Sequence, residues 1–189
     1  MRAVSDEQLI EWVAQGDSSC LGTLFERHNR SVFQFCRQMT RNNAHAEDLV
    51  QEIFLKILKK AGSYRRQGSF RAWMFNIARN LTLDQIRKAK RRRDLVPVDD
   101  SIEANPVDYR SAEVAAASSQ KMGVVVQALA NLPIAVQEVI WLGRFEFDNY
   151  EELGQALDCK PATARVRMHR AMQQLNAEFE AINGAPIDV

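Results

Sequence analysis

The sequence has little glycine or proline, few cysteines and no long apolar run, and each shortage narrows the classes of protein that it fits. Its 189 residues include 8 glycines and 5 prolines, and almost every segment has helical periodicity rather than alternation. Cys20, Cys36 and Cys159 are odd in number, widely spaced and in no CxxC pair, which argues against a disulfide framework or a zinc site. No apolar run approaches a membrane span, and the N-terminus is acidic and amphipathic rather than signal-like. We therefore expect a cytoplasmic protein with reduced cysteines.

The residue patterns of catalysis are also missing. The histidines His28, His45 and His169 are scattered along the chain, no glycine-rich phosphate loop occurs, and no Ser or Cys nucleophile is placed with a base. We therefore expect a protein that is not an enzyme and that has no catalytic residue, no metal and no cofactor.

Charges of opposite sign are concentrated in neighbouring stretches, which the formal net charge of +1 conceals. Residues 87–93 hold six cations in seven positions, and six more Lys and Arg residues lie between positions 59 and 79. The next stretch, 94–113, carries six carboxylates against Arg110 alone. Such a cluster of cations favours a polyanionic partner, because neutralising phosphates releases condensed counterions. The alternative is an ordinary solvated charge run.

The periodicity predicts an all-α fold of two helical domains. The first domain, 1–93, is a bundle of four helices: a short one after a capping box at Ser5, a second from about Ser18, and two more over 44–60 and 70–93. In the last helix one apolar stripe comprises Phe70, Trp73, Met74, Ile77, Ala78 and Leu81. Further apolar residues fall on another side, so this helix is expected to pack on more than one face; they are Phe75, Leu83 and Ile86.

The second domain is expected over 121–182, after a flexible acidic linker at 94–120 and before a tail at 183–189. Its segment YEELGQAL, a three-residue joint and a helix opened by Pro161 form a helix-turn-helix pattern. The polar face of the second helix suits a DNA major groove, with Arg for guanine edges or phosphates and an apolar Val for a thymine methyl. Its residues are Thr163, Arg165, Val166, Arg167 and Arg170. The alternative is a solvated face on a structural unit.

Two further stretches carry weaker signals. In the 44–60 helix, Leu55 lies among polar residues, away from the apolar stripe, and could dock on a basic partner helix; these neighbours include Asp48, Gln51 and Glu52. The loop over 61–70 combines aromatic, arginine and amide groups that suit stacking on unstacked bases, although by itself it reads as a surface loop. These residues are Tyr64, Arg65, Arg66 and Gln67.

Three blocks of this sequence together resemble one family. They are AEDLVQEIFLKIL at 46–58, FRAWMFNIARNLTLDQIRK at 70–88, and YEELGQALDCKPATARVRMHRAMQQL at 150–175. The chain is similar to the bacterial ECF-type (group 4) RNA polymerase sigma factors, with the first two blocks resembling region 2 and the last resembling region 4. The resemblance covers both domains in order, with region 3 absent as in that group.

The resemblance implies a role for each set of residues. Docking on the coiled-coil of the largest polymerase subunit falls to Asp48, Gln51, Glu52 and Leu55. Capture of a flipped minus-ten base falls to the loop over 63–69, with Tyr64, Arg65, Arg66 and Gln67. Contact with the neighbouring duplex and non-template strand falls to Asn76, Arg79, Asn80, Arg87 and Lys88. Reading of the minus-thirty-five element falls to Thr163, Arg165, Val166, Arg167 and Arg170. The apolar surface near Leu132 and Trp141 is a candidate for the polymerase flap.

Some positions depart from the family pattern. Gln137 stands where Arg is common, and Phe147 stands where a small residue is usual. Gly154 stands where Ala is common, and this replacement costs about 1 kcal/mol of helix propensity. Around Thr163, the usual Gly, Val and Ser are replaced by Ala162, Ala164 and Val166.

The resulting hypothesis is a sigma factor that binds core RNA polymerase, recognises two promoter elements and helps to open the minus-ten region. The resemblance also implies an anti-sigma factor as a partner. Two other classes remain open: a stand-alone helix-turn-helix regulator that binds duplex DNA without polymerase, and an adaptor or sigma mimic that occupies polymerase without reading promoters.

Overall fold

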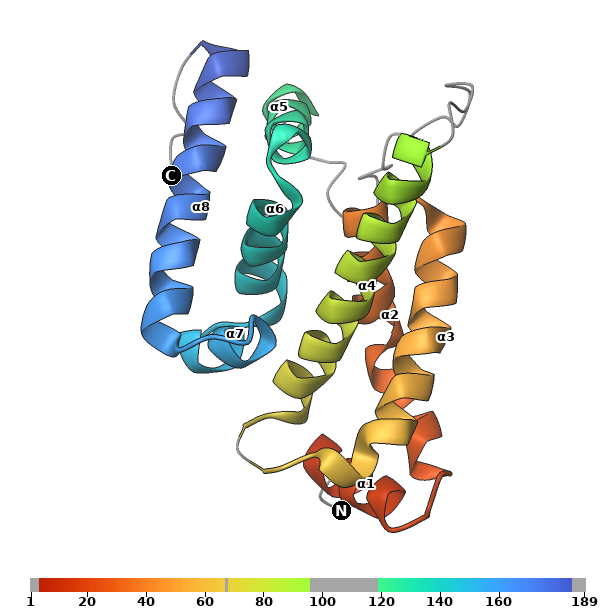
Figure 1. Ribbon diagram of the computed structural model, residues 1–189. Helices are drawn as coiled ribbons and strands as arrows, with labels where there is room; N and C mark the ends of the chain where they lie inside the picture. The colour runs from red at the N-terminus through yellow and green to blue at the C-terminus, as the bar shows by residue number, and fades with distance from the viewer. Residues whose placement is uncertain (1–3, 67, 96–118, 185–189) are drawn as a thin grey trace.

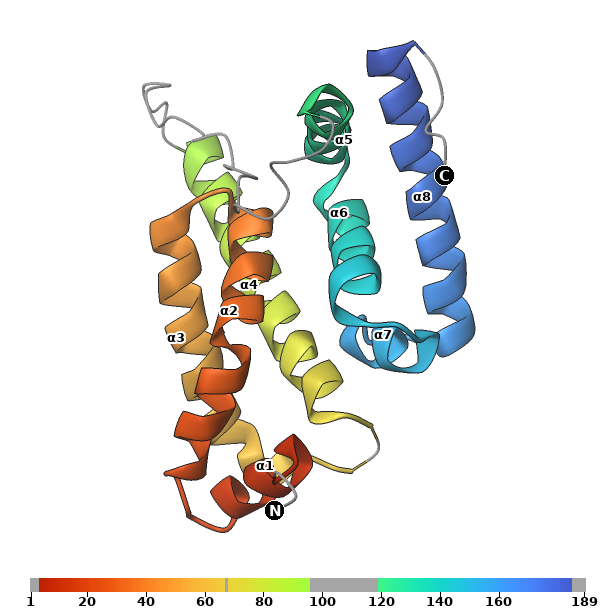
Figure 2. The same cartoon turned by 180° about the vertical axis from the view of Figure 1, so that it is seen from behind.

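A computed structural model describes residues 4–66, 68–95 and 119–184 of the chain. The described residues form eight α-helices in two groups, with α1 to α4 beside α5 to α8 (Figures 1 and 2). The predicted all-α, two-domain layout is therefore confirmed. Most of the predicted flexible linker, residues 96–118, lies outside the described residues, and the exact domain limits stay predictions. None of the described helices is both long and apolar enough to cross a bilayer.

The helices of the first group begin and end close to the predicted positions. They are α1 (Asp6–Ala14), α2 (Cys20–Thr40), α3 (Asn43–Lys60) and α4 (Phe70–Leu95), with a 3-10 turn, η1 (Ala61–Ser63), after α3. The Ser5 side chain caps α1 by accepting a hydrogen bond from the Gln8 N–H at 3.3 Å. Arg41 ends α2 in the left-handed conformation at φ 54°, and the Asn42 side chain then caps α3. Local capping chemistry thus sets the boundaries of these helices.

The second group contains the predicted helix-turn-helix. Its elements are α5 (Ser119–Asn131), α6 (Ile134–Trp141), a π-helical turn, η2 (Leu142–Glu146), α7 (Tyr150–Ala156) and α8 (Pro161–Asn183). Pro161 occupies the first turn of α8, as predicted. A Cβ added at Gly154 would lie 2.8 Å from the Cys159 carbonyl oxygen, so the glycine permits the close approach of the turn to α7. The helix propensity that Gly154 loses is thus offset by a tight α7–α8 joint.

The π-helical turn was not anticipated from the sequence. At this turn the side chains of three consecutive residues point to different environments. Phe145 is 61% exposed, with its ring centroid 4.5 Å from that of Trp141, whereas Glu146 and Phe147 are buried. A π-helical turn holds more residues than an α-helical turn and alters the direction of the side chains around it. Glu146 and Phe147 consequently face the first helical group.

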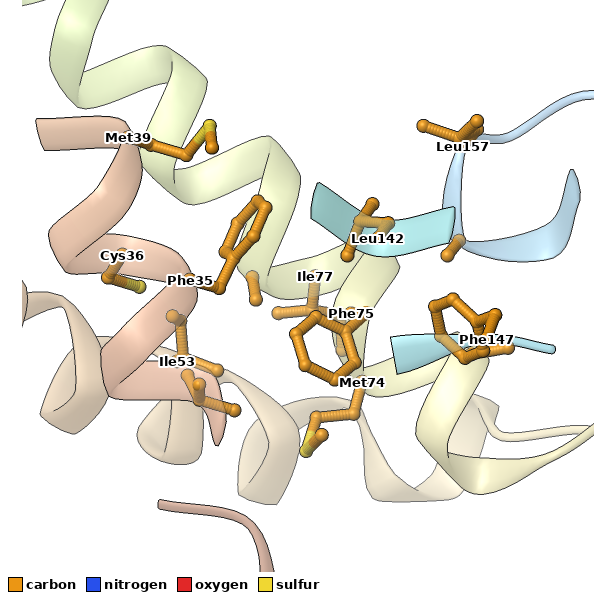
Figure 3. Packing of buried hydrophobic residues seen from close by; sticks show 14 of the residues in the cluster. Phe35, Cys36, Met39, Ile53, Met74, Phe75, Ile77, Leu142, Phe147 and Leu157 are labelled. Atoms are coloured by element: carbon orange, nitrogen blue, oxygen red, sulfur yellow. The ribbon is translucent and has the colours of Figure 1, made fainter. Parts of the chain in front are cut away.

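One hydrophobic core runs through both groups of helices. Phe75 of α4 is fully buried at the centre of the boundary (Figure 3). Its ring meets Phe35 of α2 edge-on at 5.8 Å and Phe147 edge-on at 5.7 Å. The prediction that this helix packs on more than one face is therefore confirmed, and its second apolar side, with Phe75 and Leu83 buried, is the one that the sequence analysis identified.

Candidate nucleic-acid interface

The predicted reading face of α8 lies together on the surface. Its five residues are all exposed: Thr163, Arg165, Val166, Arg167 and Arg170. The opposite side of the helix is buried against the rest of the second group through Ala164, Met168, Ala171, Leu175 and Phe179. Because one stripe of α8 is apolar and the other polar, the helix presents its cations and Val166 outward as a set.

A hollow of about 830 Å³ lies beside this face, between the π-helical turn, α7 and α8. Its charged lining comprises Arg144, Arg165 and Arg170 against Asp148, so exposed arginines continue from α8 onto the π-helical turn. The Arg165 guanidinium lies over the Tyr150 ring, with 5.3 Å from its central carbon to the ring centroid. Sequence reasoning missed Arg144, because its position follows from a turn that the periodicity does not reveal.

The predicted residues of α4 divide into two sets. Asn80, Arg87 and Lys88 are exposed, and Lys88 pairs with Asp84 one turn away at 2.8 Å. Asn76 and Arg79, by contrast, face the second helical group. The stripe that the sequence grouped as one surface is thus open toward the C-terminal end of α4 and covered toward its N-terminal end.

The covered residues make specific polar contacts. Arg79 forms a bidentate pair with Glu138 of α6, with Nε–Oε2 and Nη2–Oε1 distances of 2.9 Å. The side chains are 17% and 3% exposed, respectively, so the pair is largely shielded from water. Asn76 donates from Nδ2 to the carbonyl oxygens of Gln155 at 3.3 Å and Ala156 at 3.4 Å, at the end of α7.

A second ion pair joins the same surfaces. Arg71 of α4 contacts Glu146, whose side chain is 3% exposed. Burial raises the pKa of the Glu146 carboxyl above its usual value, and the Arg71 cation opposes that rise. Sequence reasoning counted Arg71 as a cation but assigned no role to Arg71, Glu138 or Glu146. The available signal was a carboxylate inside each of two apolar segments, VQEVIW and RFEF.

The loop between α3 and α4 is held by α1. Tyr64 is half-buried, with its ring 5.3 Å from that of Trp73 and its hydroxyl donating to the Gly68 carbonyl at 3.0 Å. Burial raises the pKa of the Tyr64 phenol, and the nearby Glu7 carboxylate adds to that rise. Arg66 pairs with Glu11 of α1, with an Nη2–Oε2 distance of 2.7 Å. The remaining predicted loop residues differ in status: Arg65 is exposed, and Gln67 lies outside the described residues.

The polar face of α3 is brought together as predicted. Asp48, Gln51 and Glu52 are exposed, and Leu55 among them is 57% exposed. The apolar side of α3, including Ile53 and Ile57, is buried in the first group of helices. An exposed leucine framed by carboxylates therefore forms a distinct surface, far from the reading face of α8 in Figure 1.

Comparison with known proteins decides the family. Residues 24–92 match the Sigma-70 region 2 family. The chain is 31% identical over 179 residues to the ECF RNA polymerase sigma factor SigM of Mycobacterium tuberculosis, a match that covers 91% of this chain and 87% of SigM. The chain belongs to the ECF RNA polymerase sigma factors. The resemblance seen in the sequence is confirmed, and family members are regulatory transcription factors rather than enzymes.

Two further relatives of this sigma factor extend the comparison. The ECF RNA polymerase sigma factor SigE of Mycolicibacterium smegmatis is 31% identical over 172 residues; the match covers 86% of this chain and 63% of SigE. The sigma factor RpoE of Bartonella quintana, solved in complex with the anti-sigma factor NepR, superposes with a TM-score of 0.64 at 25% identity. That superposition covers 84% of this chain and 96% of the RpoE chain, so both helical groups are shared.

Proposed function

We propose that this sigma factor binds core RNA polymerase, directs it to promoters with minus-ten and minus-thirty-five elements, and promotes opening of the minus-ten region without catalysing a reaction itself. The observation that carries the proposal is the pair of separate exposed surfaces on a sigma-factor fold. One is the acidic face of α3 around Leu55, and the other is the cationic reading face of α8.

Polymerase docking is assigned to α3. Asp48 and Glu52 frame Leu55, so the surface offers carboxylates for basic side chains around one apolar anchor. Anchors of this kind, surrounded by complementary charge, fit the hot-spot pattern of protein interfaces. A basic helix of the polymerase is the partner that this chemistry fits.

Reading of the upstream element is assigned to α8. Arg165, Arg167 and Arg170 carry guanidinium groups suited to guanine edges and phosphates, and the exposed Val166 suits a thymine methyl. Thr163, in the first turn of α8, is suited to a phosphate near the helix N-terminus. These contacts divide into positioning and base reading, as expected for a major-groove helix.

Work at the minus-ten region is assigned to α4 and the loop before it. The exposed cations Arg87 and Lys88, together with Asn80, support contact with the nucleic-acid backbone. Tyr64 and the arginines Arg65 and Arg66 support stacking and hydrogen bonding to an unpaired base. We also propose an anti-sigma factor as a regulatory partner, by analogy with the RpoE–NepR complex.

The test is run-off transcription with purified core polymerase, this protein and a pool of genomic promoters at a fixed salt concentration. We expect start sites that share two spaced motifs, and we expect Asp48→Arg to abolish them. Glu47→Arg is the matched control, because it makes the same charge change on the exposed surface of α3 one position away. Specific duplex binding by the protein alone, with no specific transcript, would favour a stand-alone regulator instead. Polymerase binding with no promoter-specific transcript would favour an adaptor.

A further inference from the structure

The second helical group covers the N-terminal half of α4, and the contact is chemically specific. Arg79 holds Glu138 through two hydrogen bonds of 2.9 Å, and Arg71 contacts Glu146. Both carboxylates are nearly fully buried, at 3% side-chain exposure each. A buried carboxylate needs a paired cation, so these two glutamates depend on arginines from the other helical group.

The arginines are held by groups that resemble those of a nucleic acid. A carboxylate presents two oxygens to a guanidinium in the same fork geometry that a phosphate does. Asn76 donates to two backbone carbonyl oxygens at the end of α7, much as an amide donates to an acceptor on a base edge. The second group thus supplies a carboxylate to Arg79 and acceptors to Asn76, two residues of α4 that the family resemblance assigns to promoter DNA, and a second carboxylate to the adjoining Arg71.

The contact also has an apolar part that this chain supplies. The Phe147 ring packs edge-on against Phe75 at 5.7 Å, at a position where the family resemblance implies a small residue.

A further polar contact lies elsewhere on the same boundary. Arg41, at the end of α2, donates from Nη2 to the Ala130 carbonyl oxygen of α5 at 2.5 Å. Together these contacts define one closed arrangement of the chain rather than a loose association.

We propose that the second helical group is an intramolecular competitor of promoter DNA, in which Glu138 and Glu146 hold Arg79 and Arg71 closed until polymerase and nucleic acid replace them. This inference rests on the proposed function, since it assumes that α4 meets DNA. On opening, each glutamate returns to water. Arg79, which is 17% exposed in the closed chain, becomes available to a phosphodiester, and Arg71, which is already 41% exposed, is released from its carboxylate. The Arg71 Nε–H is buried and has no hydrogen-bond partner within the described residues, so the Arg71 pair is the less complete of the two.

Closure is measured first, without DNA. Fluorophores are attached at Lys56→Cys on α3 and Gln174→Cys on α8, both exposed positions, in a Cys20→Ser, Cys159→Ser background of the full chain. The buried Cys36 is left in place. The double variant Glu138→Gln/Glu146→Gln is expected to lower energy transfer between the dyes. The matched control, Glu151→Gln/Glu180→Gln, changes the net charge equally at exposed positions of the same helical group and should leave the transfer unchanged.

Binding is measured next with the same proteins, without polymerase. The probe is a fork DNA, a duplex with a single-stranded overhang of mixed sequence, at one fixed salt concentration. Removing the two carboxylates is expected to tighten binding roughly tenfold, within the usual range for coupled equilibria, whereas the control should stay within about twofold of the parent protein. Helicity and thermal unfolding show whether each variant remains folded.

Exchanging the charges of the Arg71–Glu146 pair distinguishes loss of this ion pair from misfolding of the variant. Arg71→Glu/Glu146→Arg preserves an ion pair at the same place and is expected to restore high energy transfer relative to Glu146→Arg alone. Unchanged energy transfer in the double glutamine variant would overturn the proposal, and so would an opened chain that binds DNA no better than the control. Promoter-specific run-off transcription together with either of those results would leave the proposed function intact and remove only the competition.

Discussion

The reading face of α8 and the N-terminal half of α4 carry similar side chains, yet one faces water and the other faces a helical domain. Both present arginines with small polar residues on a helix that is buried elsewhere. The difference lies in the apolar pattern. On α8 the buried residues form one stripe, whereas α4 has a second apolar side that includes Phe75 and must also be covered.

The comparison shows that polar side chains become part of an interface when they lie between two apolar faces of the same helix, as they do on α4. Once Phe147 covers Phe75, the neighbouring Asn76 and Arg79 are partly shielded from water and need partners from the second helical group. Glu138 and the carbonyls at the end of α7 meet that need. The exposed stripe of α8 has no second apolar neighbour and stays available.

The largest effect is expected from removing the residue that makes α4 two-sided. Phe75→Ala should lower the free energy of unfolding by about 3–5 kcal/mol, because it empties a fully buried site that is packed against Phe35 and Phe147. Phe145→Ala, at a ring that is 61% exposed, should change it by no more than about 0.5 kcal/mol. Chemical denaturation followed by circular dichroism measures both. Equal losses for the two variants would contradict the two-sided packing of α4.

The next largest effect is a difference in stability between two arginine variants, one at the covered Arg79 and one at the exposed Arg167. Arg79→Ala should cost about 2–3 kcal/mol of stability, because it leaves the buried Glu138 carboxylate without its bidentate partner. Arg167→Ala, on the open face of α8, should be close to neutral. Adding Glu138→Gln to Arg79→Ala should recover part of the loss, and the double-mutant cycle measures the coupling. A coupling near zero would mean that the pair is not formed in solution.

The same Arg167→Ala variant sharpens the comparison from the side of DNA. Because Arg167 is proposed to read a base, its loss is expected to reduce discrimination at one position of the upstream element by about 1–3 kcal/mol. Run-off transcription with core polymerase on promoters substituted base by base gives the measurement. Glu178→Ala, on the same helix but paired with Asn131 within the second group, serves as the control. A uniform loss at every promoter would assign Arg167 to phosphate positioning instead.

The smallest effect is expected in the reactivity of the cysteines, which compares the buried core around Cys36 with the partly exposed helix-turn-helix joint at Cys159. Burial raises the pKa of the Cys36 thiol to about 12, and its hydrogen bond with Thr82 opposes that rise. Below that pH the thiol stays protonated and unreactive, so Cys36 should resist a thiol reagent at pH 8 until the protein unfolds. Cys159, in the joint of the helix-turn-helix, is only partly buried and should react in the native protein. Rapid labelling of all three cysteines would show that the shared core opens readily.

Much of the fold follows from local chemistry that the sequence displays. Ser5 and Pro161 begin helices at the expected places, because caps and the first helical turn involve residues only a few positions apart. The reading face of α8 follows from a single apolar stripe. These features need no knowledge of the rest of the chain, which is why a pattern along the sequence finds them.

The closed contact between the two groups could not be derived in that way. Arg79 and Glu138 are 59 positions apart, and Arg71 and Glu146 are 75 apart, so no local spacing links them. The second apolar side of α4 indicates that another element packs on it. The periodicity of the sequence does not identify which element that is. Tyr64 was likewise grouped with loop residues, although its ring packs against Trp73.

The π-helical turn before α7 has a consequence for how sigma factors of this kind could diverge. One inserted or deleted residue rotates the following side chains of a helix by about 100°. Deleting one residue here would convert the turn to ordinary α-helix and move Glu146 and Phe147 away from α4. Deletion of a single codon, with no change to the residues proposed to read the promoter, would therefore convert a chain whose two helical groups are in contact into one in which α4 is uncovered.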